Sequence, residues 1–142
     1  MLGMRDEQYR RETGTACIAG QVRLLPADQM HADPARAGTQ AAEHAASKAS
    51  GWWLHTDLGV PAADEFSACG AVHDPAMPGG LSWAELTTVI SAALHVGGCR
   101  GWSLGVYNPD LDPDRHSARQ IVNFVSQVIG NWPGLETGKR HK

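Results

Sequence analysis

The chain has few cysteines, and their spacing matches no known motif. Cys17, Cys69 and Cys99 lie far apart and form no CxxC pair. An odd number of widely spaced cysteines fits neither a disulfide framework nor a zinc site. We therefore predict free, inert thiols and a reducing, cytoplasmic compartment.

Other features that the sequence lacks exclude whole classes of protein. No apolar run approaches the roughly 20 residues that a membrane helix needs. The charged segment at residues 1–11 has no apolar stretch of the kind found in secretory signals. The net charge of −3 provides no basic surface for nucleic acid. We therefore predict neither a membrane nor a nucleic acid as partner.

What is present is the composition of an ordinary globular domain, with 42% hydrophobic and 19% charged residues. A length of 142 residues allows one hydrophobic core but not two. We predict a single domain over residues 1–132, followed by a polar tail over residues 133–142.

Strand and helix patterns alternate along the chain. Apolar and β-branched runs predict strands at residues 1–6, 18–25, 51–55 and 100–107. Asp33-Pro34 and Asp112-Pro113 are typical helix starts, and the helices that they begin extend to Ala49 and Gly130. Strands that alternate with helices form parallel sheets. We predict a three-layer α/β/α, Rossmann-like domain with a mostly parallel sheet.

The clearest helix begins at Ser82, where Ser82 and Glu85 have the spacing of a capping box. Its apolar residues recur at helical spacing, as do those of the last helix, and both sets predict a core-facing stripe. We also predict a long loop over residues 59–80. The predicted core positions are Trp83, Leu86, Val89, Ile90, Ala93 and Leu94 in the first helix, Ala118, Ile121, Val122, Val125, Val128 and Ile129 in the second, and Trp53 and Trp102 in the strands.

Ligands of parallel α/β domains bind beyond the carboxyl ends of the strands. That rule marks the segments after Leu54 and after Val106. The first segment is His55-Thr56-Asp57, in which residues 55 and 57 lie on the same side of a strand. Imidazole and carboxylate are metal ligands, so a metal site is one interpretation. A polar pair without a metal is the other.

Several motifs in order extend this observation. The segment at residues 53–57 is followed by Pro78-Gly79-Gly80-Leu81 before a helix, and then by Tyr107-Asn108-Pro109. Together they resemble the ureohydrolase family, which comprises arginase, agmatinase and formimidoylglutamase. Gly3-Met4-Arg5-Asp6 looks like a G-[IV]-R-D segment found past the middle of those chains. The resemblance covers residues 1–130 and implies the C-terminal half of an arginase-like fold.

The resemblance also implies a chemistry. Family members use two manganese ions, held by aspartates and histidines, to form a hydroxide that attacks the carbon of a guanidino or amidine group. Asp57 matches the aspartate that bridges the two metals. His55 matches the leading position of the motif, which does not itself bind metal. The implied substrate is a small guanidino compound; which of arginine, agmatine, guanidinobutyrate or formimidoylglutamate it is stays open.

The sequence departs from the family pattern at the positions that matter most. The second aspartate of the motif falls on Gly59, the following Asp-Pro falls on Ala62-Ala63, and a substrate-facing acid falls on Val106. The other metal ligands belong to the family's N-terminal half. We therefore predict no catalytic residue and no stable manganese binding for this chain. An exposed sheet edge further predicts self-association or a separate N-terminal half.

Three further acidic segments are candidate sites. Residues 28–33 have the spacing DxxHxD, which we interpret as a coincidental likeness to a family metal motif. Residues 110–114 lack the glycine and glutamate of an EF-hand, so we predict that these aspartates cap the last helix. His73-Asp74 is interpreted as a surface pair in the predicted loop, near which the family's substrate loops run.

Three interpretations of function follow. The chain is a portion of a manganese-dependent hydrolase of C–N bonds, a metal-free binding or assembly module that kept the fold, or a gene fragment without independent function.

Overall fold

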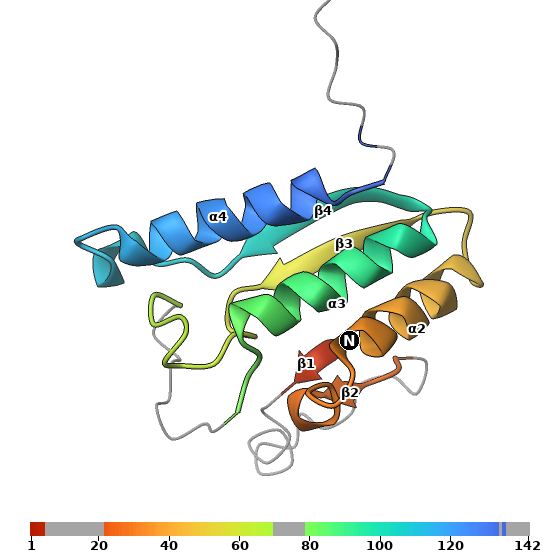
Figure 1. The fold of residues 1–142 in the computed structure, drawn as a ribbon, viewed down its shortest axis with the longest axis horizontal. Coiled ribbons are helices and arrows are strands. Elements are labelled where there is room, and N and C mark those ends of the chain that lie inside the picture. Colours follow the sequence, from red (N-terminus) through yellow and green to blue (C-terminus); the bar gives the residue numbers. More distant parts are fainter. Residues whose placement is uncertain (5–21, 70–78, 134, 136–142) are drawn as a thin grey trace, which may run out of the picture.

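The computed structural model describes residues 1–4, 22–69, 79–133 and 135. It is an α/β domain with parallel strands, as the sequence predicts (Figure 1). No helix among these residues has the length and apolar character required to cross a membrane. The elements in order are β1 (Leu2–Met4), β2 (Leu25–Pro26), the 3-10 turn η1 (Ala27–Gln29), α2 (Pro34–Ala46), β3 (Trp52–Asp57), α3 (Trp83–Val96), β4 (Cys99–Gly105), the 3-10 turn η2 (Pro109–Leu111) and α4 (His116–Gly130).

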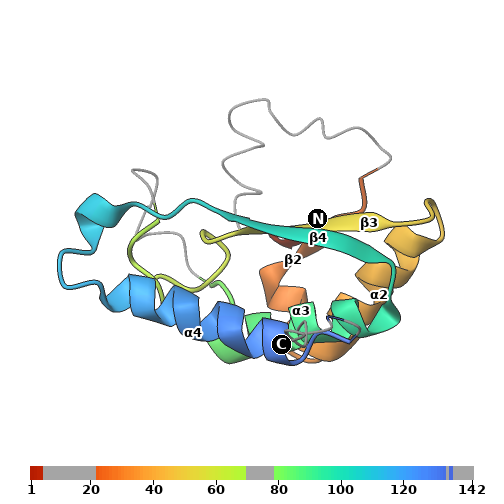
Figure 2. The same cartoon turned by 90° about the horizontal axis from the view of Figure 1, so that it is seen from above.

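The described strands form two parallel pairs, β1 with β2 and β3 with β4. In the second pair, Trp53 lies opposite Gly101 and Asp57 opposite Gly105. Figure 2 shows α2, α3 and α4 on the same side of β3 and β4. The described residues thus place one helix layer against one face of this strand pair.

The one-sided helix layer explains the burial pattern of β3. Thr56 points toward the helices and is buried, and its hydroxyl accepts a hydrogen bond from Trp102 Nε1 at 2.9 Å. Alternate residues point the other way, and Trp53 is 64% exposed. The prediction that Trp53 belongs to the core is therefore wrong, because no described helix covers its face. Trp102 packs against the core, as predicted.

Helix α3 forms the centre of the core. Its capping box is present, with Glu85 N donating to Ser82 Oγ and Ser82 N donating to Glu85 Oε2. Trp83 contacts the ring of Phe124 in α4, with ring centroids 5.1 Å apart, and Trp102 contacts the same ring with centroids 5.5 Å apart. The predicted stripe is confirmed, since its buried residues are Leu86, Val89, Ile90, Ala93 and Leu94.

Helix α4 begins later than predicted. It starts at His116, and Asp112 lies four residues before it. The Asp112 carboxylate is buried and accepts hydrogen bonds from Ser117 N at 2.9 Å, Ala118 N at 2.8 Å and Tyr107 Oη at 3.0 Å. Burial raises the pKa of Asp112, but the donors, Ala118 N first, outweigh burial, and the net pKa is lowered. Asp112 therefore caps the helix through a loop.

Two predicted core positions of α4 are also wrong. Val122 is 62% exposed and Ile129 is 40% exposed, whereas Val128 is fully buried. Phe124, which the predicted stripe omitted, is buried as well. The buried side of α4 is therefore narrower than its apolar side.

The predicted N-terminal elements fall partly on described residues. Residues 18–21 of the predicted second strand lie outside the described residues, and the described strand there, β2, includes Pro26 instead of ending before it. Asp33 caps α2 as predicted, accepting a hydrogen bond from Arg36 N at 2.9 Å. Helix α2 ends at Ala46, three residues before the predicted Ala49.

Helices α2 and α3 cross at a glycine. A Cβ atom added to Gly38 would lie 2.0 Å from the carbonyl oxygen of Val89. No Cβ atom is tolerated at that distance from a backbone atom, so only glycine permits this approach. Glycine weakens the interior of a helix, but at position 38 the packing of α2 against α3 requires it.

We predict that Gly38→Ala lowers the free energy of unfolding by about 1 to 3 kcal/mol, because overpacking exceeds the roughly 1 kcal/mol gained in helix propensity. Urea denaturation measures the change. Gly130→Ala is the matched control, because a Cβ atom there meets nothing within 4 Å; it should keep or slightly raise stability. Equal stability of the two variants would contradict the close crossing.

Candidate functional site

The two places that the sequence marks for ligands lie at one edge of the β3–β4 pair. Asp57 is the last residue of β3, and its register partner Gly105 is the last residue of β4. Val106 follows directly. Because the strands are parallel, their carboxyl ends meet, as the sequence analysis expected.

Asp57 has a structural partner at this edge. Its Oδ1 atom accepts a hydrogen bond from Gly59 N at 2.7 Å, which closes the turn after β3. The backbone of Gly59 has no positive φ, so other residues fit its conformation. A Cβ atom there would lie 3.0 Å from Asp57 Oδ1. An aspartate at position 59 would thus lie beside Asp57, whereas the glycine offers no side chain.

His55 lies on the open face of the pair and is held by β4. Its Nδ1 atom is 2.9 Å from Ser103 Oγ, and the same hydroxyl accepts a hydrogen bond from Trp53 Nε1 at 3.2 Å. The Trp53 ring covers Gly101, where an added Cβ atom would approach it to 2.3 Å, and the His55 ring lies over Gly105. The Ser103 hydroxyl therefore fixes the orientation of the His55 ring on the open face.

Ser103 is the residue that the sequence analysis missed. The available signal was the spacing Gly101-Trp102-Ser103-Leu104-Gly105, which alternates small residues along a strand. That spacing also matches GxSxG, a motif of serine hydrolases, in which the serine occupies a tight turn between a strand and a helix. Here all five residues belong to β4. The alternation instead gives the side chains of β3 room to lie across β4.

The segment at residues 28–33 has structural roles instead of a metal site. Met30 is fully buried, and Asp33 caps α2. His31 Nδ1 lies 2.8 Å from Glu85 Oε1, which joins this segment to the start of α3. The hydrogen bond from His31, followed by that from the Ser82 backbone, lowers the pKa of Glu85.

The aspartates at residues 110–114 serve the turn before α4. Asp114 Oδ1 accepts a hydrogen bond from His116 N at 3.1 Å, and Asp112 caps the helix as described. Helix capping is therefore confirmed for Asp112 and Asp114. Asp110 instead donates its backbone N–H to Asn108 Oδ1 at 3.0 Å. His73-Asp74 lies outside the described residues, as does Cys17, while Cys69 is buried and Cys99 is half-buried.

The described residues do not fit a centre of two manganese ions. In the ranges 1–4, 22–69, 79–133 and 135, no three side chains of His, Cys, Asp or Glu converge on a point where an ion could bind. At the carboxyl edge the chain offers the Asp57 carboxylate, one oxygen of which already accepts the Gly59 N–H. A hard divalent cation needs about six oxygen or nitrogen ligands, which the described residues of this edge do not supply.

Val106 has an unusual backbone. Its φ of 71° is left-handed, although β-branched residues avoid this region, and its side chain is 47% exposed. Two backbone hydrogen bonds hold the chain on either side of it: Leu58 N to Gly105 O at 3.0 Å and Asn108 N to Ala68 O at 2.8 Å. The neighbours impose a conformation that suits Gly, Asn or Asp better than Val. Strain of this kind is frequent at functional edges.

The fold is that of known ureohydrolases. Arginase from Helicobacter pylori matches with a TM-score of 0.68 and 17% identity, covering 92% of this chain and 42% of that one. Formimidoylglutamase from Bacillus subtilis matches with a TM-score of 0.70 and 16% identity, covering 92% and 40%. The agmatine ureohydrolase of Thermoplasma volcanium matches at 0.59 and 13%, covering 78% and 34%.

These identities show a shared fold and nothing finer. No protein-family model and no curated protein sequence matches the chain. The chain spans about two fifths of the length of the arginase and formimidoylglutamase structures that it matches. The arginase-like α/β fold expected from the motifs is thereby confirmed.

A first prediction concerns Glu85. Because its folded pKa lies below the ordinary value of 4.5, its ionised form stabilises the fold above that value, and the contribution is lost as pH falls through the lowered pKa. Glu85→Gln keeps the capping geometry without the charge and should lower the free energy of unfolding at pH 7 by about 0.5 to 1 kcal/mol. Urea denaturation from pH 7 to pH 3 should show a smaller acid loss for the variant. Glu43→Gln, at an exposed position of α2, should leave the profile of the parent chain unchanged.

A second prediction concerns the strain at Val106. Val106→Asn should raise the free energy of unfolding by about 1 kcal/mol, since asparagine tolerates φ > 0 at lower cost. Thermal and urea denaturation measure the gain. Val22→Asn replaces an exposed valine without a positive φ and should bring no such gain. A loss of stability in Val106→Asn would show that the left-handed backbone at this position is not maintained in solution.

Proposed function

We propose that this chain, whose fold is that of part of an arginase-like ureohydrolase, belongs to that family and has no ureohydrolase activity of its own. The observation that carries the proposal is the carboxyl edge of β3 and β4. By the sequence resemblance, Asp57 matches the family's metal-bridging aspartate, while Gly59 and Val106 stand where the family has further acidic side chains. We interpret the chain as a binding or assembly module that kept the fold.

The proteins that share this fold support a proposal about the substrate class. These proteins are an arginase, a formimidoylglutamase and an agmatine ureohydrolase, and the structure of the Entamoeba histolytica arginase contains bound L-ornithine. We propose that any ancestral or assembled activity acts on small guanidino or formimino compounds and depends on manganese. The described residues do not supply a complete set of metal ligands for that chemistry.

A second candidate is a site shared with another segment of protein. The chain covers 42% of the Helicobacter pylori arginase, so the remaining ligands would come from elsewhere. The strained Val106 favours this candidate, because a left-handed residue beside Asp57 preserves the backbone of a functional edge without its side chain. Coexpression with a segment that carries a DxHxD motif separates the candidates: urea release would support the shared site.

Manganese binding tests the main proposal. We expect the parent chain to show no tight Mn²⁺ binding by electron paramagnetic resonance and to release no urea from arginine or agmatine. Gly59→Asp should strengthen Mn²⁺ binding by about tenfold or more, because it places a second carboxylate next to Asp57 where the backbone permits it.

Ser47→Asp is the charge-matched control, since it adds the same charge at the exposed end of α2. It should not change Mn²⁺ binding. Tight Mn²⁺ binding or urea release by the unmodified chain would refute the proposal that the chain is an inactive module. Equal Mn²⁺ binding by Gly59→Asp and Ser47→Asp would show that Asp57 is not part of a remnant metal site.

A further inference from the structure

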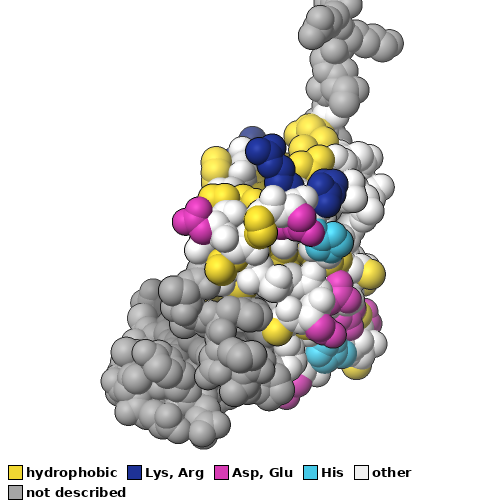
Figure 3. Space-filling model, turned by 90° about the vertical axis from the view of Figure 1, so that its left-hand side faces the viewer, with side chains coloured by type: hydrophobic (Ala, Val, Ile, Leu, Met, Phe, Trp, Pro, Cys, Tyr) yellow, Lys and Arg dark blue, Asp and Glu magenta, His cyan; other side chains and the backbone are white. Residues whose placement is uncertain are grey.

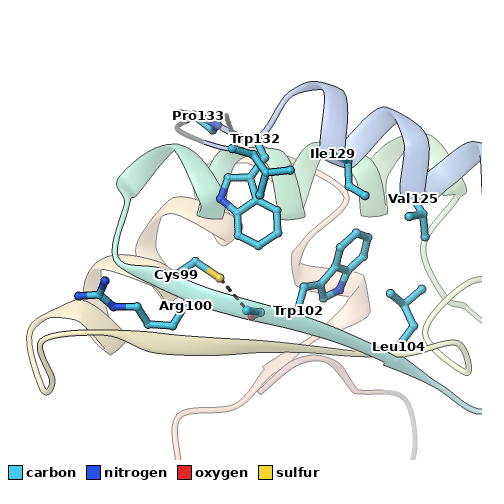
Figure 4. A pocket seen from close by; sticks show the side chains of 10 residues that line it. Cys99, Arg100, Trp102, Leu104, Val125, Ile129, Trp132 and Pro133 are labelled. Atoms are coloured by element: carbon cyan, nitrogen blue, oxygen red, sulfur yellow. Dashed lines mark hydrogen bonds between the residues drawn. The ribbon is translucent and has the colours of Figure 1, made fainter. Parts of the chain in front are cut away.

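Ser103 points to the open face of the β3–β4 pair. In Figure 4 its neighbours in β4, Trp102 and Leu104, point toward α4. Because successive side chains of a strand alternate, Ser103 lies on the opposite face, where it contacts Trp53 and His55 of β3. Trp53 is 64% exposed, His55 is exposed and Ser103 is half-buried. The serine hydroxyl is thus held between two rings at a surface that a small molecule can reach.

The hydrogen bonds of this cluster fix the direction of the Ser103 hydroxyl. An indole N–H only donates, so Trp53 Nε1 donates to Ser103 Oγ at 3.2 Å. The hydroxyl hydrogen is left for another acceptor, and within the described part of the chain that acceptor is His55 Nδ1, 2.9 Å away. The lone pair of the neutral imidazole is therefore on Nδ1 and faces the serine proton. A hydroxyl in hydrogen-bond contact with an imidazole, at about 2.6 to 3.2 Å, is the arrangement of an activated serine nucleophile.

Other serines donate to groups that are much weaker bases. Ser47 Oγ donates to His44 O at 2.8 Å, and Ser126 Oγ donates to Val122 O at 2.7 Å. A peptide carbonyl does not take a proton near neutral pH, so neither hydroxyl is activated. Both serines are exposed, whereas Ser103 is half-buried. Accessibility and activation therefore predict opposite orders of reactivity.

Ser82 also contacts an ionisable group, but it serves as a cap. Its Oγ donates to Glu85 Oε2 at 2.9 Å and accepts from Glu85 N at 3.2 Å. The hydrogen bond from His31, followed by that from the Ser82 backbone, lowers the pKa of Glu85. A less basic carboxylate takes a proton less readily, so Ser82 is not activated as Ser103 is.

The surroundings of Ser103 favour an uncharged substrate. The Trp53 ring lies over Gly101, so β4 supports one face of the indole, and the exposed part of the ring offers a flat apolar surface. Figure 3 views the molecule from the side on which both strands end and shows acidic, basic and hydrophobic side chains there. Neither sign of charge surrounds the strand ends alone. An ester with an apolar group that packs on Trp53 fits this environment.

We propose that Ser103 is an acyl-acceptor site, at which an uncharged ester transfers its acyl group to the serine hydroxyl with His55 as the base. Ser103 Oγ attacks the carbonyl carbon of the ester while His55 Nδ1 takes the hydroxyl proton. The C–O bond to the leaving group then breaks, and the leaving oxygen takes that proton from His55. The products are an acyl-serine and a free alcohol. This inference uses neither Asp57 nor Gly59, so it is independent of the proposed function.

Acetylation of the full chain by 4-nitrophenyl acetate tests the proposal. Peptide mapping by mass spectrometry compares the acetylation rates of individual serines within one sample. We expect Ser103 to react at least about 100-fold faster than Ser47 and Ser126, since a positioned base contributes about 10²- to 10⁴-fold. Comparable rates for the three serines would overturn the proposal, because exposure favours the other two.

His55→Asn separates the basicity of the imidazole from its hydrogen bond. The amide oxygen of asparagine can accept the Ser103 hydrogen but does not take the proton. The variant should acetylate Ser103 at least about tenfold more slowly, while its melting temperature stays close to that of the parent chain. Ser126→Ala is the control and should leave the acetylation of Ser103 unchanged. A folded His55→Asn variant that acetylates Ser103 at the parent rate overturns the proposal, and the comparison of serines within the parent chain does not depend on the folding of any variant.

Discussion

The parallel register between β3 and β4 is the constraint on which the arrangement of the domain depends. It brings Asp57 and Gly105 to the same edge, and it directs alternate side chains of both strands toward a single helix layer. The same register turns Trp53 and His55 to the open face, where Ser103 holds them. The candidate site, the core and the open face are consequences of one pairing.

Local signals in the sequence were sufficient wherever a short segment determines its own structure. The capping box of Ser82 and Glu85 places the start of α3, and the Asp33 cap places that of α2, because each satisfies backbone groups within one turn. The start of α4 was not predictable in this way. Asp112 caps it across a turn of several residues, and its carboxylate is positioned by Tyr107 as well as by the helix.

Hydrophobic periodicity did not predict which faces of the strands and helices are covered by other parts of the chain. An apolar residue at a strand or helix position indicates a surface that avoids water, but not whether the same chain provides the cover. Trp53, Val122 and Ile129 were therefore assigned to a core that the described residues do not complete. Ser103 was missed for a related reason, since its role depends on two side chains of a strand about fifty residues earlier.

The edge can lose its chemistry without loss of the fold, and the packing explains why. Gly59 and Val106 lie in turns beyond the strands, and the side chain of Val106 reaches solvent. A substitution at such a position leaves the packing of the hydrophobic core unchanged. A single methyl group at Gly38, in contrast, would collide with the backbone of α3. The residues that define an arginase-like fold are thus physically separable from those at the carboxyl edge of the strands, so the fold does not depend on which side chains this edge carries.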